Sequence, residues 1–276
     1  MFSPVPGTDV ELAVIGGGKM GEALLGGLLR AGNVTSKDVL IVEPDAARRG
    51  ALADLFPGVA VVASVPVNLH AAGVLVAVKP QHVEEACRQI AGAAGRVLSI
   101  AAGVTAATIE RALAQGAPGR SVPVVRAMPN TPSLVGVGAS AIAPGTSAGD
   151  DDLTWAQGVL SAVGIVVRVD EKQLDAVTGL SGSGPAYLFL VAEAMIDAGV
   201  LLGLTRPVAR ALVAQTIRGA GTLLTDSEDD AATLRANVTS PGGTTAAGLR
   251  ALEAGGVRSA VIDAVAAATR RATELG

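Results

Sequence analysis

Aromatic residues are scarce in this 276-residue chain: three Phe, one Trp and one Tyr are too few to form a platform on which nucleic-acid bases stack. Basic residues do not dominate either, since 21 Lys and Arg stand against 25 Asp and Glu and give a formal net charge of −4. A nucleic-acid-binding protein needs a basic surface that displaces counterions from phosphates, so the composition excludes that class. It favours a compact, acidic metabolic enzyme whose partner is a small molecule.

Cysteine occurs once, so the chain cannot form an intramolecular disulfide, which fits a reducing compartment. Cys87 lies in a segment predicted to be helical, residues 81–88, and is interpreted as a buried, inert thiol rather than a reactive one. The amino-terminal residues contain neither a basic region nor an apolar run, so no secretory signal is expected. These features predict a cytoplasmic protein.

Long apolar runs without charge are also lacking. Residues 187–204 come nearest, but Glu193 and Asp197 interrupt them, four residues apart on one helical face. Two acids would be costly at that place in a bilayer, so the segment is predicted to be a buried helix of a soluble protein. No membrane partner is expected.

Half of the residues are hydrophobic, and in the first part of the chain they form short runs that alternate with helical stretches. Near-continuous apolar strands separated by helices indicate a parallel sheet covered on both faces, an α/β fold of the Rossmann type. The predicted strands are 12–15, 39–42, 59–63, 74–78, 97–100 and 122–127, with edge strands at 139–143 and 165–169. The predicted helices are 22–31, 45–55, 80–90 and 151–163.

The pattern changes after Asp170, where no further strand is predicted. The helices expected there are 185–203, 205–224, 230–238, 245–254 and 257–275. The sequence therefore predicts two domains, a dinucleotide-binding domain at 1–169 and an all-helical domain at 170–276. The acidic run 226–230 is interpreted as a solvated turn between two helices.

A dinucleotide fingerprint, G-x-G-x-x-G, occurs at Gly16-Gly17-Gly18-Lys19-Met20-Gly21, directly after the first predicted strand. In this pattern Gly16 permits the tight turn, Gly18 lets the backbone approach a pyrophosphate, and Gly21 lets the helix pack on the strand. The N–H groups at the helix start face the anion. The alternative interpretation is a glycine turn that only packs.

The residues leave the choice between NADPH and NADH open. Glu43 ends the second predicted strand about 22 residues after Gly21, where an acid hydrogen-bonds the ribose 2′-hydroxyl and favours NADH. However, Arg48 and Arg49 follow within a turn and can neutralise the 2′-phosphate of NADPH. Pro44 can also direct the Glu43 side chain away from the ribose.

Three further polar or glycine-rich segments follow apolar strands, at 78–80, 101–103 and 126–132. The carboxyl ends of parallel strands are where an open α/β sheet binds its ligand, so Lys79 is expected beside the cofactor. The alternative for Lys79 is a surface lysine whose aliphatic part covers apolar surface. His70 and His82 have no partner at metal-ligand spacing, so no metal site is expected.

In the helical half, two segments rich in glycine and hydroxyl groups precede predicted helices, at 178–187 and 238–245. The second gathers hydroxyls and backbone N–H groups in a turn at a helix start. Such a turn binds a small carboxylate, and the helix dipole strengthens the binding. The alternative is an elaborate helix cap.

With these motifs the chain resembles the pyrroline-5-carboxylate reductase family, essentially from end to end. The resemblance includes the fingerprint, Ala77-Val78-Lys79-Pro80, Ala101-Ala102-Gly103 and Met128-Pro129-Asn130-Thr131-Pro132, and it is most specific at 175–187 and 238–245. It implies reduction of 1-pyrroline-5-carboxylate to L-proline with NADPH, or with NADH, as the last step of proline biosynthesis. It also implies a Rossmann-type domain and a helical domain that dimerises by interleaving helices, with larger rings of dimers in some members.

The resemblance also implies which residues serve each site. The cofactor site would be lined by Gly16, Gly18, Lys19, Met20, Gly21, Asn68, Val78, Lys79, Pro80, Ala102, Gly103 and Asn237. The substrate would be held by Ser240, Gly242, Gly243, Thr244 and Thr245. Thr245 would be the catalytic residue, through a hydrogen bond to the imine nitrogen. Residues 181–187 would support the dimer core, and Glu228 would lie near the site.

Two other functions share part of the pattern. A β-hydroxyacid dehydrogenase would share the first domain, but it is expected to place a catalytic lysine on a helix after the sheet, and no lysine follows Lys172. A non-catalytic dinucleotide sensor would use the helical half as a partner surface. Oxidation of NADPH on addition of pyrroline-5-carboxylate distinguishes an enzyme from a sensor.

Overall fold

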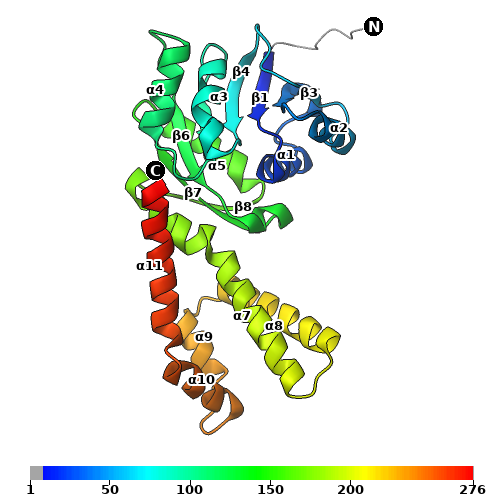
Figure 1. Ribbon diagram of the computed structural model, residues 1–276, viewed down its shortest axis with the longest axis vertical. Coiled ribbons are helices and arrows are strands. Elements are labelled where there is room, and N and C mark those ends of the chain that lie inside the picture. The colour runs from blue at the N-terminus through cyan, green and yellow to red at the C-terminus, as the bar shows by residue number, and fades with distance from the viewer. Residues whose placement is uncertain (1–8, 276) are drawn as a thin grey trace. The chain divides into compact units, whose positions relative to one another are not determined.

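The computed structural model describes residues 9–275, so the amino-terminal residues 1–8, where no secretory signal is expected, lie outside the described residues. The described chain contains an eight-stranded sheet with the order β3-β2-β1-β4-β5-β6-β7-β8 (Figure 1). The strands are β1 (Asp9–Ile15), β2 (Val39–Val42), β3 (Ala60–Val62), β4 (His70–Val76), β5 (Val97–Ser99), β6 (Val124–Met128), β7 (Gly138–Pro144) and β8 (Gly164–Arg168). The predicted α/β class with a Rossmann-type first domain is confirmed.

Helices cover both faces of the sheet. Side chains alternate between the two faces along each strand, and in the central strands the apolar side chains of both faces are buried. On β1, Ala13 and Ile15 pack toward α3 (Val83–Ile90) and α4 (Ala106–Gly116). Leu12 and Val14 pack toward the opposite face. The helices of that face are α1 (Lys19–Ala31), α2 (Ala46–Leu55) and α5 (Asp150–Ser161). This double burial explains why β2 is apolar at all four positions.

Three features of the first domain differ from the prediction. Helix α4 was not predicted, although Thr105 caps it by accepting a hydrogen bond from the Thr108 N–H group. Strand β7 runs antiparallel to β6, since the connection between them is too short for the crossover that parallel strands need. Strand β4 ends at Val76 rather than at residue 78.

A loop, residues 63–69, connects β3 to β4 where a crossover helix would be expected. Val65 and Leu69 of this loop pack against the same core cluster as α3 and α4. The loop thus covers a part of the sheet that has no helix of its own.

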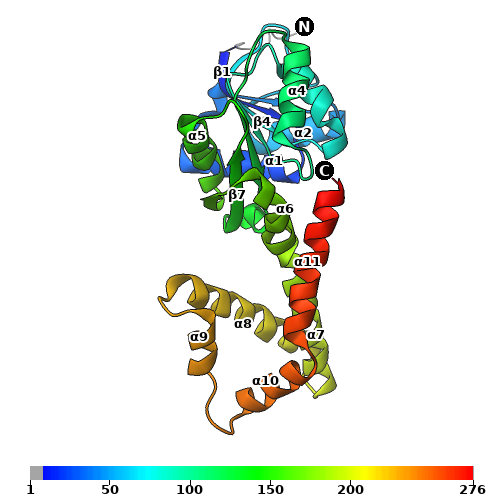
Figure 2. The same cartoon turned by 90° about the vertical axis from the view of Figure 1, so that its left-hand side faces the viewer.

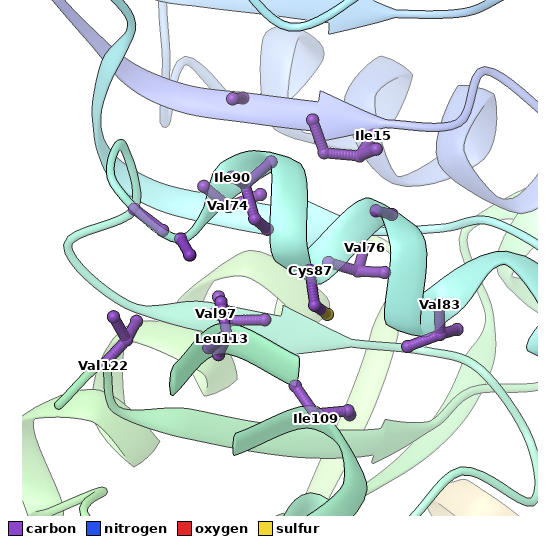
Figure 3. Packing of buried hydrophobic residues seen from close by; sticks show 14 of the residues in the cluster. Ile15, Val74, Val76, Val83, Cys87, Ile90, Val97, Ile109, Leu113 and Val122 are labelled. Atoms are coloured by element: carbon purple, nitrogen blue, oxygen red, sulfur yellow. The ribbon is translucent and has the colours of Figure 1, made fainter. Parts of the chain in front are cut away.

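Cys87 is fully buried in the core between α3 and the sheet, as Figure 3 shows, among neighbours such as Val76, Val83 and Ile109. Burial raises the pKa of its thiol to about 12, and the nearby Glu84 carboxylate acts in the same direction. The thiolate, which is the reactive form, is therefore almost absent at neutral pH. The structure thus agrees with the interpretation of Cys87 as an inert thiol.

We expect a thiol reagent such as dithiobisnitrobenzoate to leave the native protein unmodified over a time in which the urea-unfolded protein reacts fully, at one thiol per chain. The absorbance of the released thionitrobenzoate measures the reaction. Rapid modification of the folded protein would contradict the buried, protonated state of Cys87.

The structure divides into two compact units, which differ from the predicted domains. The first contains the sheet and runs to Ser183, and it also includes the residues from Ala267 to the end of the chain. The second comprises Gly184–Ala266. The predicted boundary after residue 169 instead follows the last strand, β8.

The second unit is all-helical, as predicted (Figure 2). Its helices are α7 (Gly184–Leu201), α8 (Arg206–Asp226), α9 (Ala231–Asn237), α10 (Thr244–Ala254) and the first part of α11 (Val257–Leu275). Few of their side chains are buried, with Ala209 and Val213 of α8 as the examples within this unit.

The prediction of a buried helix at 187–204 is wrong for the single chain. No residue of α7, all of which is described, is buried, and Phe189 and Leu190 are 69% and 67% exposed. By length and composition alone, the helical stretch Glu171–Leu201 is apolar enough to cross a membrane. The physical reason for the exposure is that α7 packs against α8 through one side only, for example at Gly199 and Ala209.

Candidate functional site

The carboxyl ends of β1, β4 and β5 lie side by side at one edge of the sheet. The register pairs Ile15 with Val76 and Val76 with Ser99, the last residues of these three strands. The segments that follow the strands, which hold most of the predicted cofactor residues, are therefore neighbours. This is the edge at which an open α/β sheet binds its ligand.

The backbone of the fingerprint explains each of its three key glycines. Gly16 has a φ of +98°, and a Cβ there would lie 2.8 Å from the carbonyl oxygen of Ala77. A Cβ on Gly21 would lie 2.6 Å from the carbonyl oxygen of Gly16. A Cβ on Gly18, in contrast, would meet nothing within 4 Å. Gly16 and Gly21 are thus required by the fold, whereas the space at Gly18 is open.

Helix α1 begins beside this open space. Gly18 is its N-cap and provides no side-chain hydrogen bond, so the N–H groups of the first turn are left for an anion. Lys19, whose side chain is 79% exposed, is the first helical residue. This geometry fits the pyrophosphate of a dinucleotide better than a turn that only packs, and the backbone from Gly18 to Gly21 would hold it.

The Glu43 side chain points to the fingerprint loop. Its Oε2 accepts a hydrogen bond from the Gly17 N–H group and its Oε1 one from the Asp45 N–H group, both at 2.9 Å. A Cβ on Gly17 would lie 2.3 Å from Leu52 and 3.3 Å from Glu43 Oε2, so this position also requires glycine. The role of Gly17 was missed from the sequence because its contacts come from residues far along the chain.

Arg48 contacts the same peptide from the other side. Its Nε donates a hydrogen bond to the Gly17 carbonyl oxygen at 2.6 Å, and its Nη2 donates to the Glu22 carboxylate. Arg49 donates through Nη1 to the carbonyl oxygens of Glu43 and Pro44. Both arginines at the start of α2 are therefore bound to the protein near the fingerprint.

The other predicted cofactor residues of the first unit divide into two groups. Val78, Lys79 and Pro80 follow β4, while Ala102 and Gly103 follow β5, so all of them lie at the carboxyl edge. Lys79 and Ala102 are exposed there. Asn68 is different. It lies two residues before His70, the first residue of β4, and His70 pairs with Asp9, the first residue of β1. The structure therefore places Asn68 at the opposite edge of the sheet, where the predicted cofactor contact is not supported.

Arg126 is 8% exposed and lies on β6. Its Nη1 lies 2.7 Å from Oε1 of Glu171, and the same oxygen accepts a hydrogen bond from the Ala106 N–H group at 2.7 Å. Glu171 thus joins β6 to the N-terminus of α4, directly after the segment that contains Ala102 and Gly103. Because Glu171 follows the predicted boundary at 169/170, this contact explains why the first compact unit extends beyond it.

Asn130 joins the loop after β6 to a π-helical turn, Thr178–Gly182. Its Oδ1 accepts a hydrogen bond from the Ala139 N–H group, and its Nδ2 donates to the Ser181 carbonyl oxygen at 3.2 Å. The motif 128–132 and the motif 175–187 are therefore in contact through the backbone of Ser181.

The predicted substrate residues form a turn at the start of α10 in the second unit. The Gly243 N–H group donates a hydrogen bond to the Ser240 carbonyl oxygen at 3.0 Å, and Gly242 has a φ of +69°. Gly243 is the N-cap and provides no side-chain hydrogen bond. Thr244 is exposed and Thr245 is half-buried, both in the first helical turn. The N–H groups of this turn are thus left for an anion, as for α1.

Two more predicted residues lie in the second unit. Asn237 ends α9, and its amide donates a hydrogen bond to the Asp229 carboxylate at 3.2 Å. Glu228 is exposed between α8 and α9, in the acidic run that the sequence identifies as a solvated turn. In this turn Asp230 caps α9, and the hydrogen bond from the Thr233 N–H group lowers the pKa of the Asp230 carboxyl.

A metal centre is not found in the part of the chain that the structure describes, where no group of three or more His, Cys, Asp or Glu side chains could hold an ion. His70 lies at the start of β4, and His82 lies at the start of α3.

Comparisons with known proteins identify relatives over the whole chain. A family model described as pyrroline-5-carboxylate reductase dimerisation matches residues 171–275, and one described as NADP oxidoreductase, coenzyme F420-dependent, matches residues 11–103. The pyrroline-5-carboxylate reductase of Synechocystis sp. is 44% identical over 274 residues, which cover 97% of this chain and 99% of that protein. The one of Pseudomonas aeruginosa is 41% identical over 269 residues, 96% of each chain.

Solved structures agree with these relatives. The structure of a pyrroline-5-carboxylate reductase from Coxiella burnetii has a TM-score of 0.88 and 34% identity, and the match covers 97% of this chain and 98% of that one. The pyrroline carboxylate reductase of Plasmodium falciparum, solved with NADP bound, has a TM-score of 0.82 and 29% identity, over 98% and 99% of the two chains. The similarity thus extends through both the sheet and the helices.

Proposed function

This chain belongs to the pyrroline-5-carboxylate reductase family, and we propose that it catalyses the reaction after which the family is named, the reduction of 1-pyrroline-5-carboxylate to L-proline with NADPH. The observation that carries this proposal is the match to curated members at 44% identity over nearly the full length. The predicted resemblance is confirmed by the same match. No finding favours the alternative of a non-catalytic dinucleotide sensor.

The substrate is a five-membered cyclic imine that carries a carboxylate. The turn from Ser240 to Gly243 and the uncapped start of α10 offer N–H groups and hydroxyls to that carboxylate. Anchoring the carboxylate fixes the orientation of the ring, and positioning of this kind contributes on the order of several kcal/mol to catalysis.

When bound, NADPH supplies the hydride that the imine carbon accepts. The imine nitrogen takes up one proton, so that the C=N bond becomes the C–N bond of the proline amine. Thr245 is the proposed hydrogen-bond partner of this nitrogen, because its hydroxyl lies in the first turn of α10. A hydroxyl of ordinary pKa is a poor acid, so the proton itself comes from solvent.

The second unit belongs to the segment that the family model describes as dimerisation, and the chain forms a homodimer. The exposed apolar side chains of α7 support this assembly, since a second copy would remove them from water. A ring of such dimers is a further proposal, supported by the family resemblance alone. The expected location is the cytoplasm, in keeping with one unpaired cysteine.

The proposed reaction is tested by adding 1-pyrroline-5-carboxylate to the purified protein and NADPH. We expect a decrease in NADPH absorbance that depends on both the protein and the imine, together with formation of proline. Titration of NADPH without the imine serves as the control. Binding of NADPH without oxidation would support the sensor and contradict the reductase.

We expect Thr245→Ala to lower kcat by about tenfold, because one hydrogen bond that positions the imine nitrogen is lost. Thr245→Ser keeps the hydroxyl and should retain most of the activity. Steady-state kinetics at saturating NADPH measure both effects. Unchanged kinetics in Thr245→Ala would remove this residue from the mechanism.

A further inference from the structure

A cluster of charged side chains surrounds the Gly17 peptide and is not used by the reaction proposed above. This Gly17 cluster consists of Glu22, Glu43 and Arg48. Glu43 lies at the end of β2, where an acid ordinarily binds the ribose 2′-hydroxyl and repels the 2′-phosphate of NADPH. The structure raises the question of how a chain with this acid accommodates NADPH.

The Glu43 carboxylate is held by the protein itself. Each of its oxygens accepts one backbone N–H group, from Gly17 and from Asp45, both at 2.9 Å. Such hydrogen bonds stabilise the charge of a carboxylate and fix its orientation. Glu43 therefore supports the fingerprint loop, and its charge is partly compensated before a cofactor arrives.

Arg48 is fixed at two points and has donors to spare. A guanidinium carries five N–H groups. In Arg48, Nε donates to the Gly17 carbonyl oxygen and Nη2 donates to Glu22, whereas Nη1 makes no hydrogen bond with the described residues 9–275. The side chain is 25% exposed, so part of it is open to solvent. Because Arg48 is already ordered, binding a phosphate would cost little side-chain entropy.

Arg49 also keeps donors that no described residue uses, but it is bound to a different part of the chain. Its Nη1 donates to the carbonyl oxygens of Glu43 and Pro44, at 2.9 and 2.7 Å, so it contacts the turn after β2 and not the Gly17 peptide of the fingerprint. These bonds stabilise the turn after β2.

From this arrangement we propose that Arg48 is the residue that selects NADPH over NADH, by binding the 2′-phosphate, while the Gly17 and Asp45 N–H groups hold the Glu43 carboxylate and lessen its repulsion of that phosphate. The inference rests on the proposed function for the identity of the cofactor. It concerns only the adenosine half of the dinucleotide, so it is tested without the imine and without turnover.

The test uses titration calorimetry to measure the affinity of the full-length protein for adenosine 2′,5′-bisphosphate and for adenosine 5′-monophosphate. These probes differ by the 2′-phosphate alone. A hydrogen bond to a charged group of this kind corresponds to roughly 10- to 100-fold in affinity, so we expect the wild type to bind the bisphosphate at least about tenfold more tightly.

Arg48→Gln is expected to bring the two affinities within about threefold of each other, while the affinity for the monophosphate changes little. The matched control is Arg111→Gln on α4, which removes the same charge from an exposed site and should leave the ratio unchanged. Glu43→Gln should alter the ratio by less than about threefold. The far-UV circular dichroism and the melting temperature of each variant verify that it is folded.

Three results would overturn the proposal. Equal weakening of both probes by Arg48→Gln would mean that Arg48 only supports the Gly17 peptide. A wild type that prefers the monophosphate would mean that Glu43 rejects the 2′-phosphate. An increase of about tenfold or more, in Glu43→Gln, in the ratio of the bisphosphate affinity to the monophosphate affinity would also mean that Glu43 rejects the 2′-phosphate. Absence of reductase activity with normal probe binding would instead contradict the proposed function and leave this inference intact.

Discussion

The Gly18→Val variant is expected to fold normally and to lose dinucleotide binding. In the structure a Cβ at this position meets nothing within 4 Å, and the φ of −64° with ψ of 178° is extended backbone that valine adopts without strain. The fold therefore tolerates the side chain. The branched side chain would nevertheless occupy the open space beside the first N–H groups of α1, where the pyrophosphate must approach the backbone.

Titration with NADPH and a thermal unfolding curve measure the two effects separately. We expect no detectable binding, and a melting temperature within about 4 °C of the wild type, which corresponds to roughly 1 kcal/mol for a domain of this size. Gly50→Ala, also at a position with open space, should bind NADPH normally. Gly21→Val should be unstable, since its Cβ would lie 2.6 Å from the Gly16 carbonyl oxygen. An unchanged NADPH affinity in Gly18→Val would contradict the assignment of the fingerprint.

Phe189→Glu is expected to convert the dimer to a monomer. Phe189 is 69% exposed on α7, between Leu188 and Leu190, which are also exposed. In a dimer formed through this helix, the new carboxylate would be buried without a partner, and an unpaired buried charge is strongly destabilising. In a monomer it would be solvated at no cost, so the substitution shifts the equilibrium to separate chains.

Sedimentation equilibrium measures the outcome. Leu55→Glu is the matched control, since Leu55 is a 51% exposed leucine at the end of α2 in the first unit. It should remain dimeric. A Phe189→Glu protein that stays dimeric would show that α7 does not contribute to the interface at this position.

Elements with a strong local signal could be predicted from the sequence almost to the residue. Strand β2 was expected at 39–42 and is found there, because four apolar residues in succession are typical of a strand buried on both faces. Helix α11 was expected at 257–275 and is found there, since Gly255 and Gly256 mark its start. Such signals lie within the segment itself.

The features that were missed depend on residues far apart in the sequence. The segment 178–182 has the composition of a loop, yet it forms a π-helical turn, and the Ser181 carbonyl oxygen in this turn accepts a hydrogen bond from Asn130, 51 residues earlier. The direction of β7 depends on a short connection rather than on its own residues. The exposure of α7 in the single chain depends on how it packs against α8, which its own apolar sequence does not indicate.

The candidate site shows the same division. The glycines of the fingerprint were predictable from their spacing, because strand, turn and helix follow one another directly. The contacts of Gly17 with Glu43 and Arg48 join residues that are 26 and 31 positions apart, so no local pattern indicates them. Asn68 was assigned by resemblance, and its position before β4 could be recognised only from the register of that strand.

The path of the chain through its two units has a consequence for how the molecule responds to cleavage. The polypeptide leaves the first unit once, at Ser183, and returns to it once, at Ala267, through the continuous helix α11. Thr273 of the returning segment donates a hydrogen bond to Asp175, and Ala272 is buried there. A protease that nicks the exposed acidic turn between α8 and α9 would therefore produce two fragments that each keep an anchor in the same folded body, so the nicked protein would hold together without a covalent bond between its halves.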